Sequence, residues 1–147
     1  MNEKKLTWTD EAREEVCRRL RNRIEDSLVT LNQTASKAHE AYEEDYYNFF
    51  INGARALLYT KMKISAWEDI YRTLLDQGVS ETYLVLSEKV RQYEEELLHG
   101  FKFRRSSDAM LDIASELSRF LAQYLLYHFK NILEMMCHYA TKEGKGN

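Results

Sequence analysis

Residues 117–129 of this chain read Leu117-Ser118-Arg119-Phe120-Leu121-Ala122-Gln123-Tyr124-Leu125-Leu126-Tyr127-His128-Phe129. They form the middle of a longer segment, 107–142. On an α-helix, with about 100° between successive side chains, one stripe of this segment holds Met110, Leu117, Leu121, Tyr124, His128, Ile132, Met135 and Tyr139. Further Leu, Phe and Met side chains widen the stripe to more than half of the circumference. A helix this apolar needs several neighbours to cover it, so we predict a long central helix near the C-terminus.

The composition favours helices over sheet. The chain has 147 residues, no proline and five glycines, and 31% of its residues are charged, with both signs mixed at short spacing. Proline is common at sheet edges and turns, whereas mixed charges at short spacing suit helix surfaces. The length is that of one domain, so we expect a single helical domain over 1–147, with loose ends at 1–8 and 143–147.

The first helix is predicted from a regular apolar seam. Thr9 is a suitable N-cap, and the seam that follows consists of Ala12, Val16, Leu20, Ile24, Leu28, Leu31 and Ala35. The polar stretch 33–36 interrupts this pattern, but the apolar phase continues beyond it. Two alternatives therefore stay open, one continuous helix from 10 to about 63 or two helices that meet at 33–36. We favour the break, because a helix of about 50 residues is unusual in globular proteins.

Cap residues divide the middle of the chain. Ser65 and Glu68 have the spacing of a capping box that would begin a short helix, and Gly78 suits the position just after its end. Ser80 then caps a helix over 81–99. Gly100 would end that helix, and Ser107 would cap the last one. Together these segments predict an all-α antiparallel bundle of about five helices.

Charge and cysteine content set limits on function. The formal net charge of −3 gives no overall attraction to nucleic acid or to an acidic membrane surface. Cys17 and Cys137 are too few for a disulfide framework and stand singly rather than in metal-binding pairs. The first residues lack the apolar run of a signal peptide, and no apolar stretch reaches membrane-spanning length. We therefore expect a cytoplasmic protein with reduced cysteines.

His128 is the residue that invites a chemical role. Its place in the apolar stripe predicts that it is buried, where it could serve as a metal or haem ligand or as a base. The interpretation we favour is a core histidine bonded to a tyrosine hydroxyl or a backbone carbonyl. Glu96 and His99 have a spacing known from di-metal bundles, but no set of four inward ligands accompanies them. We expect no catalytic, cofactor or metal residues.

Two basic clusters could contact phosphate groups. The first runs from Arg18 to Arg23, and its arginines are expected to spread over the exposed sides of the helix. The second comprises Lys102, Arg104 and Arg105, which lie beside phenylalanines just before a predicted helix start. The alternative interpretation is an ordinary solvated surface, and nucleic acid is not the favoured partner.

Tyrosine is abundant, with ten in the chain, and an aromatic group follows the first helix: Tyr42, Tyr46, Tyr47 and Phe50. We favour a covered core helix here, but the wide apolar arc also suits an interface with a second protein. The function we expect is a small helical protein-interaction module, an adaptor, regulator or inhibitor that also self-associates and acts through a tyrosine-rich or charged face. The alternative is a helical subunit of a nucleic-acid-binding complex that uses both basic clusters. A metal- or haem-binding bundle around His128 is a more distant one.

Overall fold

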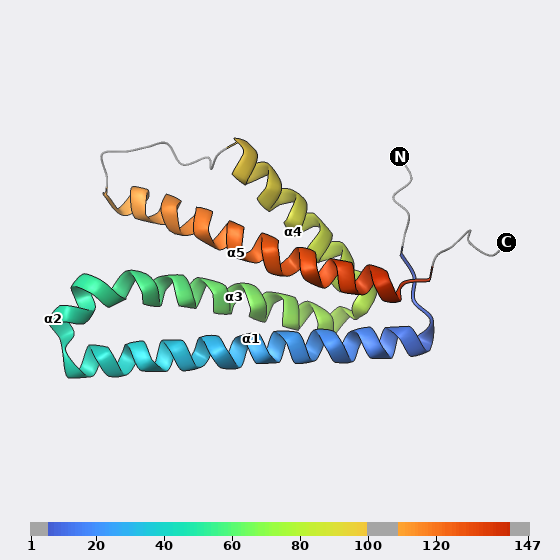
Figure 1. The fold of residues 1–147 in the computed structure, drawn as a ribbon, viewed down its shortest axis with the longest axis horizontal. Helices are drawn as coiled ribbons and strands as arrows, with labels where there is room; N and C mark the ends of the chain where they lie inside the picture. Colours follow the sequence, from blue (N-terminus) through green and yellow to red (C-terminus); the bar gives the residue numbers. More distant parts are fainter. Residues whose placement is uncertain (1–5, 100–108, 142–147) are drawn as a thin grey trace.

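A computed structural model describes residues 6–99 and 109–141, and it is helical almost throughout them (Figure 1). In these residues the four long helices are α1 (Asp10–Glu44), α3 (Ala54–Gln77), α4 (Val79–His99) and α5 (Ala109–Tyr139). A single-turn helix α2 (Tyr46–Asn48) and a π-helical turn η1 (Phe49–Gly53) connect α1 to α3. The predicted all-α class is confirmed, and the described residues contain four long helices and one short one where about five were expected.

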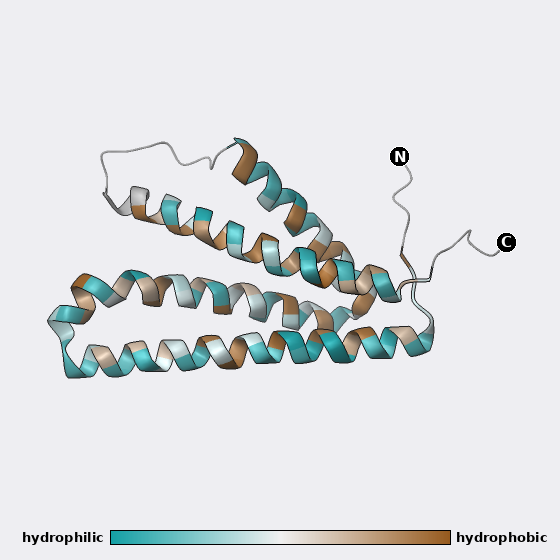
Figure 2. Cartoon of the chain, viewed as in Figure 1, coloured by the Kyte–Doolittle hydropathy of each residue, from teal (hydrophilic) through white to brown (hydrophobic). Residues whose placement is uncertain are grey.

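Helices α1 and α3 lie side by side, α4 crosses behind and diverges from α5 toward its C-terminal end, and successive long helices run in alternate directions (Figure 1). Helix α5 contacts α1, α3 and α4, as a central helix should. Helices α1, α3 and α4 also each contact the other three long helices, so α5 is not more central than they are. Figure 2 shows hydrophobic residues recurring along each long helix, and the buried ones from all four helices form one cluster. The four apolar faces therefore cover each other, which is how a bundle of amphipathic helices removes them from water.

Helix α1 begins where the sequence indicated and continues through the expected break. The Thr9 hydroxyl oxygen accepts a hydrogen bond from the Ala12 N–H at 3.2 Å, which confirms the cap. The break at 33–36 was a wrong prediction. The Asn32 amide and the Thr34 hydroxyl each donate to the carbonyl four residues earlier, at 2.9 and 3.1 Å. These polar side chains are thus bonded within the helix, while Leu31 and Ala35 keep the buried seam unbroken.

The chain reverses at Asp45 instead, so the alternative of one helix to about residue 63 was also wrong. Asp45 leaves the helical conformation, with φ −147° and ψ 84°, and its carboxylate accepts a hydrogen bond from the Asn48 N–H at 3.1 Å. An aspartate in this conformation caps a new helix, which here is α2. Because α2 and η1 stay helical, the apolar spacing continues across the reversal although the helix axis turns.

The internal serine caps were wrong, whereas the glycine end was right. Ser65 lies inside α3, whose buried seam runs through Ile64, Trp67, Ile70 and Leu74. Gly78 ends α3 with φ 91°, a conformation that favours glycine. Helix α4 starts directly afterwards, so Ser80 lies within its first turn. The expected roles of Gly100 and Ser107 lie outside the described residues.

Trp67 of α3 and Phe129 of α5 form the centre of the core. Both are fully buried, and their rings meet edge to face with 5.6 Å between centroids. The side of α5 that faces the core is shifted from the predicted stripe. Its buried residues are Leu117, Ala122, Leu125, Phe129, Ile132 and Met136, whereas Leu121, Tyr124, His128, Met135 and Tyr139 are half-buried. The shift follows from packing, because α4 covers the Phe129 side of α5, where Tyr93 contacts Phe129.

The segment before α1 is attached to the end of α5. Trp8 is buried, and its indole N–H donates to the Met136 carbonyl at 2.9 Å. The Thr141 N–H donates to the Thr7 carbonyl at 2.7 Å. Residues 7 and 8, which were expected to be loose, are therefore fixed. Detaching Trp8 from α5 would expose its indole ring to water and break its hydrogen bond to the Met136 carbonyl.

Replacement of Phe129 by alanine should destabilise the fold by about 3–5 kcal/mol, because it removes a fully buried ring from the centre of the core. The matched control is Tyr127→Ala, which removes an aromatic ring that is 66% exposed on the same helix. We expect a change of about 0.5 kcal/mol or less for the control. Urea unfolding followed by circular dichroism measures both, and equal losses would show that α5 packs by a different face.

Candidate functional site

Exposed aromatic side chains lie where α1 reverses into α3, and we call this surface the aromatic end. It comprises Tyr42, Tyr46, Tyr47 and Phe50 together with the aliphatic Ile51, all of them exposed. Tyr47 is 75% exposed and Phe50 67% exposed. No residue of α2 or η1 is buried. The favoured interpretation of a covered core helix was therefore wrong, and the structure brings all four predicted aromatic residues together on the surface.

The rings of the aromatic end are held by each other. Tyr42 meets Tyr46 and Phe49 edge to face, with centroids 5.1 and 5.3 Å apart, and Tyr46 stacks on Phe50 at 6.2 Å. Gly53 makes room for this arrangement, because a Cβ atom there would lie 2.9 Å from the Phe49 ring. Aromatic pairs of this kind gain a little over their area burial, so these contacts restrain the rings of Tyr42, Tyr46 and Phe50 although the rings are exposed.

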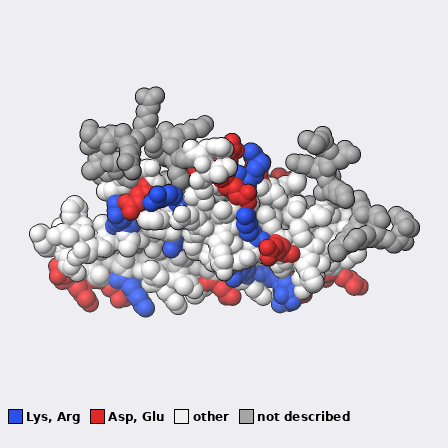
Figure 3. All heavy atoms as spheres, turned by 45° about the horizontal axis from the view of Figure 1, so that its top comes forward, with Lys and Arg blue, Asp and Glu red and all other residues white. Residues whose placement is uncertain are grey.

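The aromatic end is acidic as well as apolar. Four exposed carboxylates border it, those of Glu40, Glu43, Glu44 and Asp45, and no lysine or arginine occurs from residue 38 to 54. Figure 3 shows the corresponding end of the molecule, at the left, as largely uncharged surface with acidic atoms along its lower edge. Elsewhere on the visible face, acidic and basic side chains are interspersed. The combination of rings and carboxylates therefore distinguishes this end.

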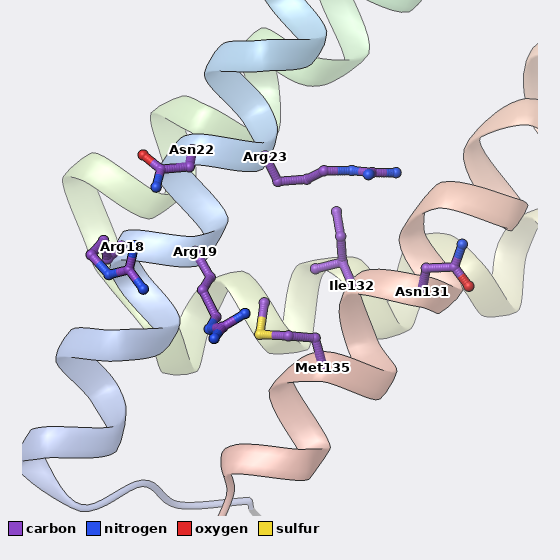
Figure 4. A pocket seen from close by; sticks show the side chains of 7 residues that line it. All are labelled: Arg18, Arg19, Asn22, Arg23, Asn131, Ile132 and Met135. Carbon is purple, nitrogen blue, oxygen red and sulfur yellow. The ribbon is translucent and has the colours of Figure 1, made fainter.

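A second feature lies between α1 and α5, and we call it the basic groove. It has a volume of about 390 Å³ and is lined by Arg18, Arg19, Asn22, Arg23, Asn131, Ile132 and Met135 (Figure 4). The arginines of the 18–23 cluster were expected to spread around the helix. Three of them line the groove, and Figure 4 shows Arg19 and Arg23 extending toward α5 while Arg18 lies farther from it. Arg19 and Arg23 are four residues apart and therefore share a face of the helix. That spacing was visible in the sequence, but the contribution of Asn131 from α5 was not. Lys102, Arg104 and Arg105 lie outside the described residues.

The arginines of the groove have unequal partners. Glu15 accepts hydrogen bonds from both Arg18 and Arg19, at 2.6 and 2.7 Å. These two bonds hold the pKa of the Glu15 carboxyl below its usual range. Arg23 has a neutral partner, since its guanidinium donates to Nδ1 of His128 at 2.7 Å. An arginine has no acceptor to offer, so the imidazole must accept with an unprotonated nitrogen.

His128 is half-buried rather than buried, and its partner is not the one expected. Burial lowers the pKa of His128, and the charges of Arg23 and Lys63 lower it further. The Lys63 ammonium group lies over the rings of Tyr59 and Tyr124, at 4.0 and 4.7 Å from their centroids. Burial also lowers the pKa of Lys63. Three basic groups thus converge from α1, α3 and α5.

Two kinds of feature are absent from the described part of the chain, a group of three or more possible metal ligands and a membrane-spanning helix. No three or more His, Cys, Asp or Glu side chains among residues 6–99 and 109–141 are grouped so that they could hold a metal ion. Cys17 and Cys137 are both free thiols. Nor does any helix within these ranges combine the length and the apolar character needed to cross a bilayer.

No protein-family model, curated protein or solved structure matches this chain.

The free energy of unfolding should depend on pH through His128. Its pKa in the folded state lies below the unfolded value of about 6.5, so on acidification the unfolded state takes up the proton first. This contribution to stability is complete above pH 6.5 and decreases as the pH falls toward the folded-state pKa. A His128→Gln variant should lose less stability between pH 7.5 and 5.5 than the unchanged chain. Urea titrations at several pH values measure the free energy of unfolding of both chains. The same loss of that free energy between pH 7.5 and 5.5 in the two chains would refute the prediction.

Proposed function

We propose that this chain is a small cytoplasmic protein-interaction module, a single-domain antiparallel bundle that binds a second protein through the aromatic end. The observation that carries the proposal is the exposure of four aromatic side chains, Tyr42, Tyr46, Tyr47 and Phe50, at one reversal of the chain, three of them in ring contact with one another. Contiguous exposed apolar surface is costly in water, and on soluble proteins it marks a site of interaction. The assigned activity is binding, without catalysis.

Aromatic side chains are well suited to this role. Tyrosine and tryptophan dominate the energetics of protein interfaces, because each buries a large area with few rotatable bonds. At the aromatic end the ring contacts of Tyr42 and Tyr46 already restrict those bonds. Ordering the side chains before binding lowers the entropy cost of association. Tyrosine hydroxyl groups can also donate hydrogen bonds at the rim of an interface.

The charges around the rings indicate the chemistry of the partner. Glu40, Glu43, Glu44 and Asp45 favour a surface that carries lysine or arginine, because complementary charge speeds encounter and rejects acidic partners. The faces of the tyrosine and phenylalanine rings also attract cations. We therefore propose a partner with an apolar centre and basic residues around it. Two copies joined through this end would bring like charges together. The self-association that we predict would therefore use another surface of the chain.

The double variant Tyr47→Ala/Phe50→Ala should bind the partner about 30-fold or more weakly, as expected when two interface anchors are lost. Its stability should change by about 1 kcal/mol at most, since both side chains are exposed. The partner can be trapped with a photo-crosslinking residue at position 47 in extracts of the cells that make this protein. The affinity is then measured by calorimetry with the purified partner.

Two controls make this test specific. Tyr127→Ala removes an equally exposed aromatic side chain from α5 and should leave the affinity unchanged. Glu43→Lys/Glu44→Lys should slow association and reduce the dependence of the rate on salt. If the double variant binds as tightly as the unchanged chain, the aromatic end is not the interface.

The nucleic-acid alternative is supported by less of the structure. Of its two basic clusters, Arg18–Arg23 lies within the described residues and lines the basic groove. The groove lies between α1 and α5 and shares no residue with the aromatic end.

A further inference from the structure

The basic groove carries more positive charge than its neighbours neutralise. Three guanidinium groups line it, and in the described part of the chain Glu15 is the one carboxylate within 4.0 Å of any of them. Two arginines share that carboxylate, which leaves an excess of two positive charges. Asn22 and Asn131 border the groove. A concave site lined by cations is complementary to an anion with several acceptor oxygens.

Arg19 and Arg23 are the arginines best placed to hold such an anion. Figure 4 shows both side chains extending from α1 toward α5, with Ile132 and Met135 of α5 close to them. The hydrogen-bond acceptor of the Arg23 guanidinium is the neutral imidazole of His128, and a charged acceptor would form a stronger bond with it. The charge of Lys63 acts on the same imidazole as that of Arg23. An anion beside Arg23 would offer its guanidinium a charged acceptor, which the imidazole is not.

The size and surroundings of the groove select the class of ligand. Its volume of about 390 Å³ falls in the range of small-molecule sites, roughly 300–1,000 Å³. A nucleic-acid backbone needs a long basic track that contacts many phosphates. Here the arginines are bordered on α1 by Glu14, Glu15, Glu25 and Asp26, so the positive surface is short. The apolar side chains of Ile132 and Met135 can pack against a carbon skeleton or a ring.

We propose that the basic groove binds a small organic phosphate, with Arg19 and Arg23 holding the phosphate group and Ile132 and Met135 contacting its organic part. The bidentate geometry of a guanidinium matches two phosphate oxygens, which a lysine in the same place could not reproduce. The phosphate would compete with Nδ1 of His128 for the Arg23 guanidinium. This site is separate from the aromatic end and goes beyond the proposed interaction with a protein.

Isothermal titration calorimetry at low salt tests this with the full chain and three probes: phenyl phosphate, adenosine 5′-monophosphate and inorganic phosphate. Phenol and adenosine are the matched compounds without phosphate. We expect both organic phosphates to bind at least about tenfold more tightly than their matched compounds and than inorganic phosphate. Arg23→Gln and Arg19→Gln should each weaken binding about tenfold or more. Both side chains are exposed, so these variants should remain folded, and circular dichroism checks that they do.

Arg21→Gln is the matched control, because Arg21 belongs to the same cluster but lies 4.0 Å from Glu25 and does not line the groove. It should leave phosphate affinity within about twofold. The Tyr47→Ala/Phe50→Ala chain should also bind the phosphates unchanged. The proposal fails if the unchanged chain binds no organic phosphate at millimolar concentration, or if Arg21→Gln weakens binding as much as Arg23→Gln. It fails equally if a single-stranded oligonucleotide binds far more tightly than the mononucleotide with a steep salt dependence, which would favour the nucleic-acid alternative.

Discussion

The contact between Trp67 of α3 and Phe129 of α5 is the interaction on which the bundle is assembled. Two fully buried rings meet there edge to face, and Tyr93 of α4 packs on the other side of Phe129. The indole N–H of Trp67 donates to the Tyr124 hydroxyl at 3.0 Å, so the polar atom of this large side chain is satisfied at the edge of the core. Helices that are far apart in sequence are thereby held together.

Both candidate surfaces follow from this packing. The core occupies the middle of the bundle and the end where Trp8 is attached, while the reversal between α1 and α3 extends beyond it and contributes no buried side chain from α2 or η1. The aromatic residues there are consequently free to contact another molecule. The groove arises differently, because Ile132 enters the core from α5 beside the exposed face of α1. The arginines of that face therefore lie beside the apolar side chains of Ile132 and Met135.

Much of the fold could be predicted from the sequence, because apolar periodicity is a local signal. The Thr9 cap, the seam of α1 and the glycine at the end of α3 were predicted correctly for this reason. The break at 33–36 and the cap at Ser65 were wrong because local cap signals compete with a buried seam, and burying several apolar side chains stabilises the helix more than one cap does. The reversal at Asp45 was missed since the apolar phase continues through it. Asp45 was the available signal, because aspartate is favoured at the N-cap of a helix, and its carboxylate does accept a hydrogen bond from the Asn48 N–H.

The candidate sites were less predictable, because they depend on which helices become neighbours. Periodicity places Tyr42, Tyr46 and Phe50 on one side of a helix, but it does not say whether another helix covers them. Likewise, the position of His128 in the apolar stripe predicted burial, and only the packing of α4 against the Phe129 side leaves it half-buried beside Arg23. Exposure and proximity are tertiary properties, and a single sequence contains them indirectly.

Hydrogen exchange resolved by residue tests most directly that the core of α5 is covered and that the aromatic end is not. Amides of residues 122–136 should exchange through global unfolding, and those of 45–53 should exchange orders of magnitude faster through local opening. The opposite pattern in the monomer, with 45–53 as protected as α5 or with 122–136 exchanging freely, would contradict this structure.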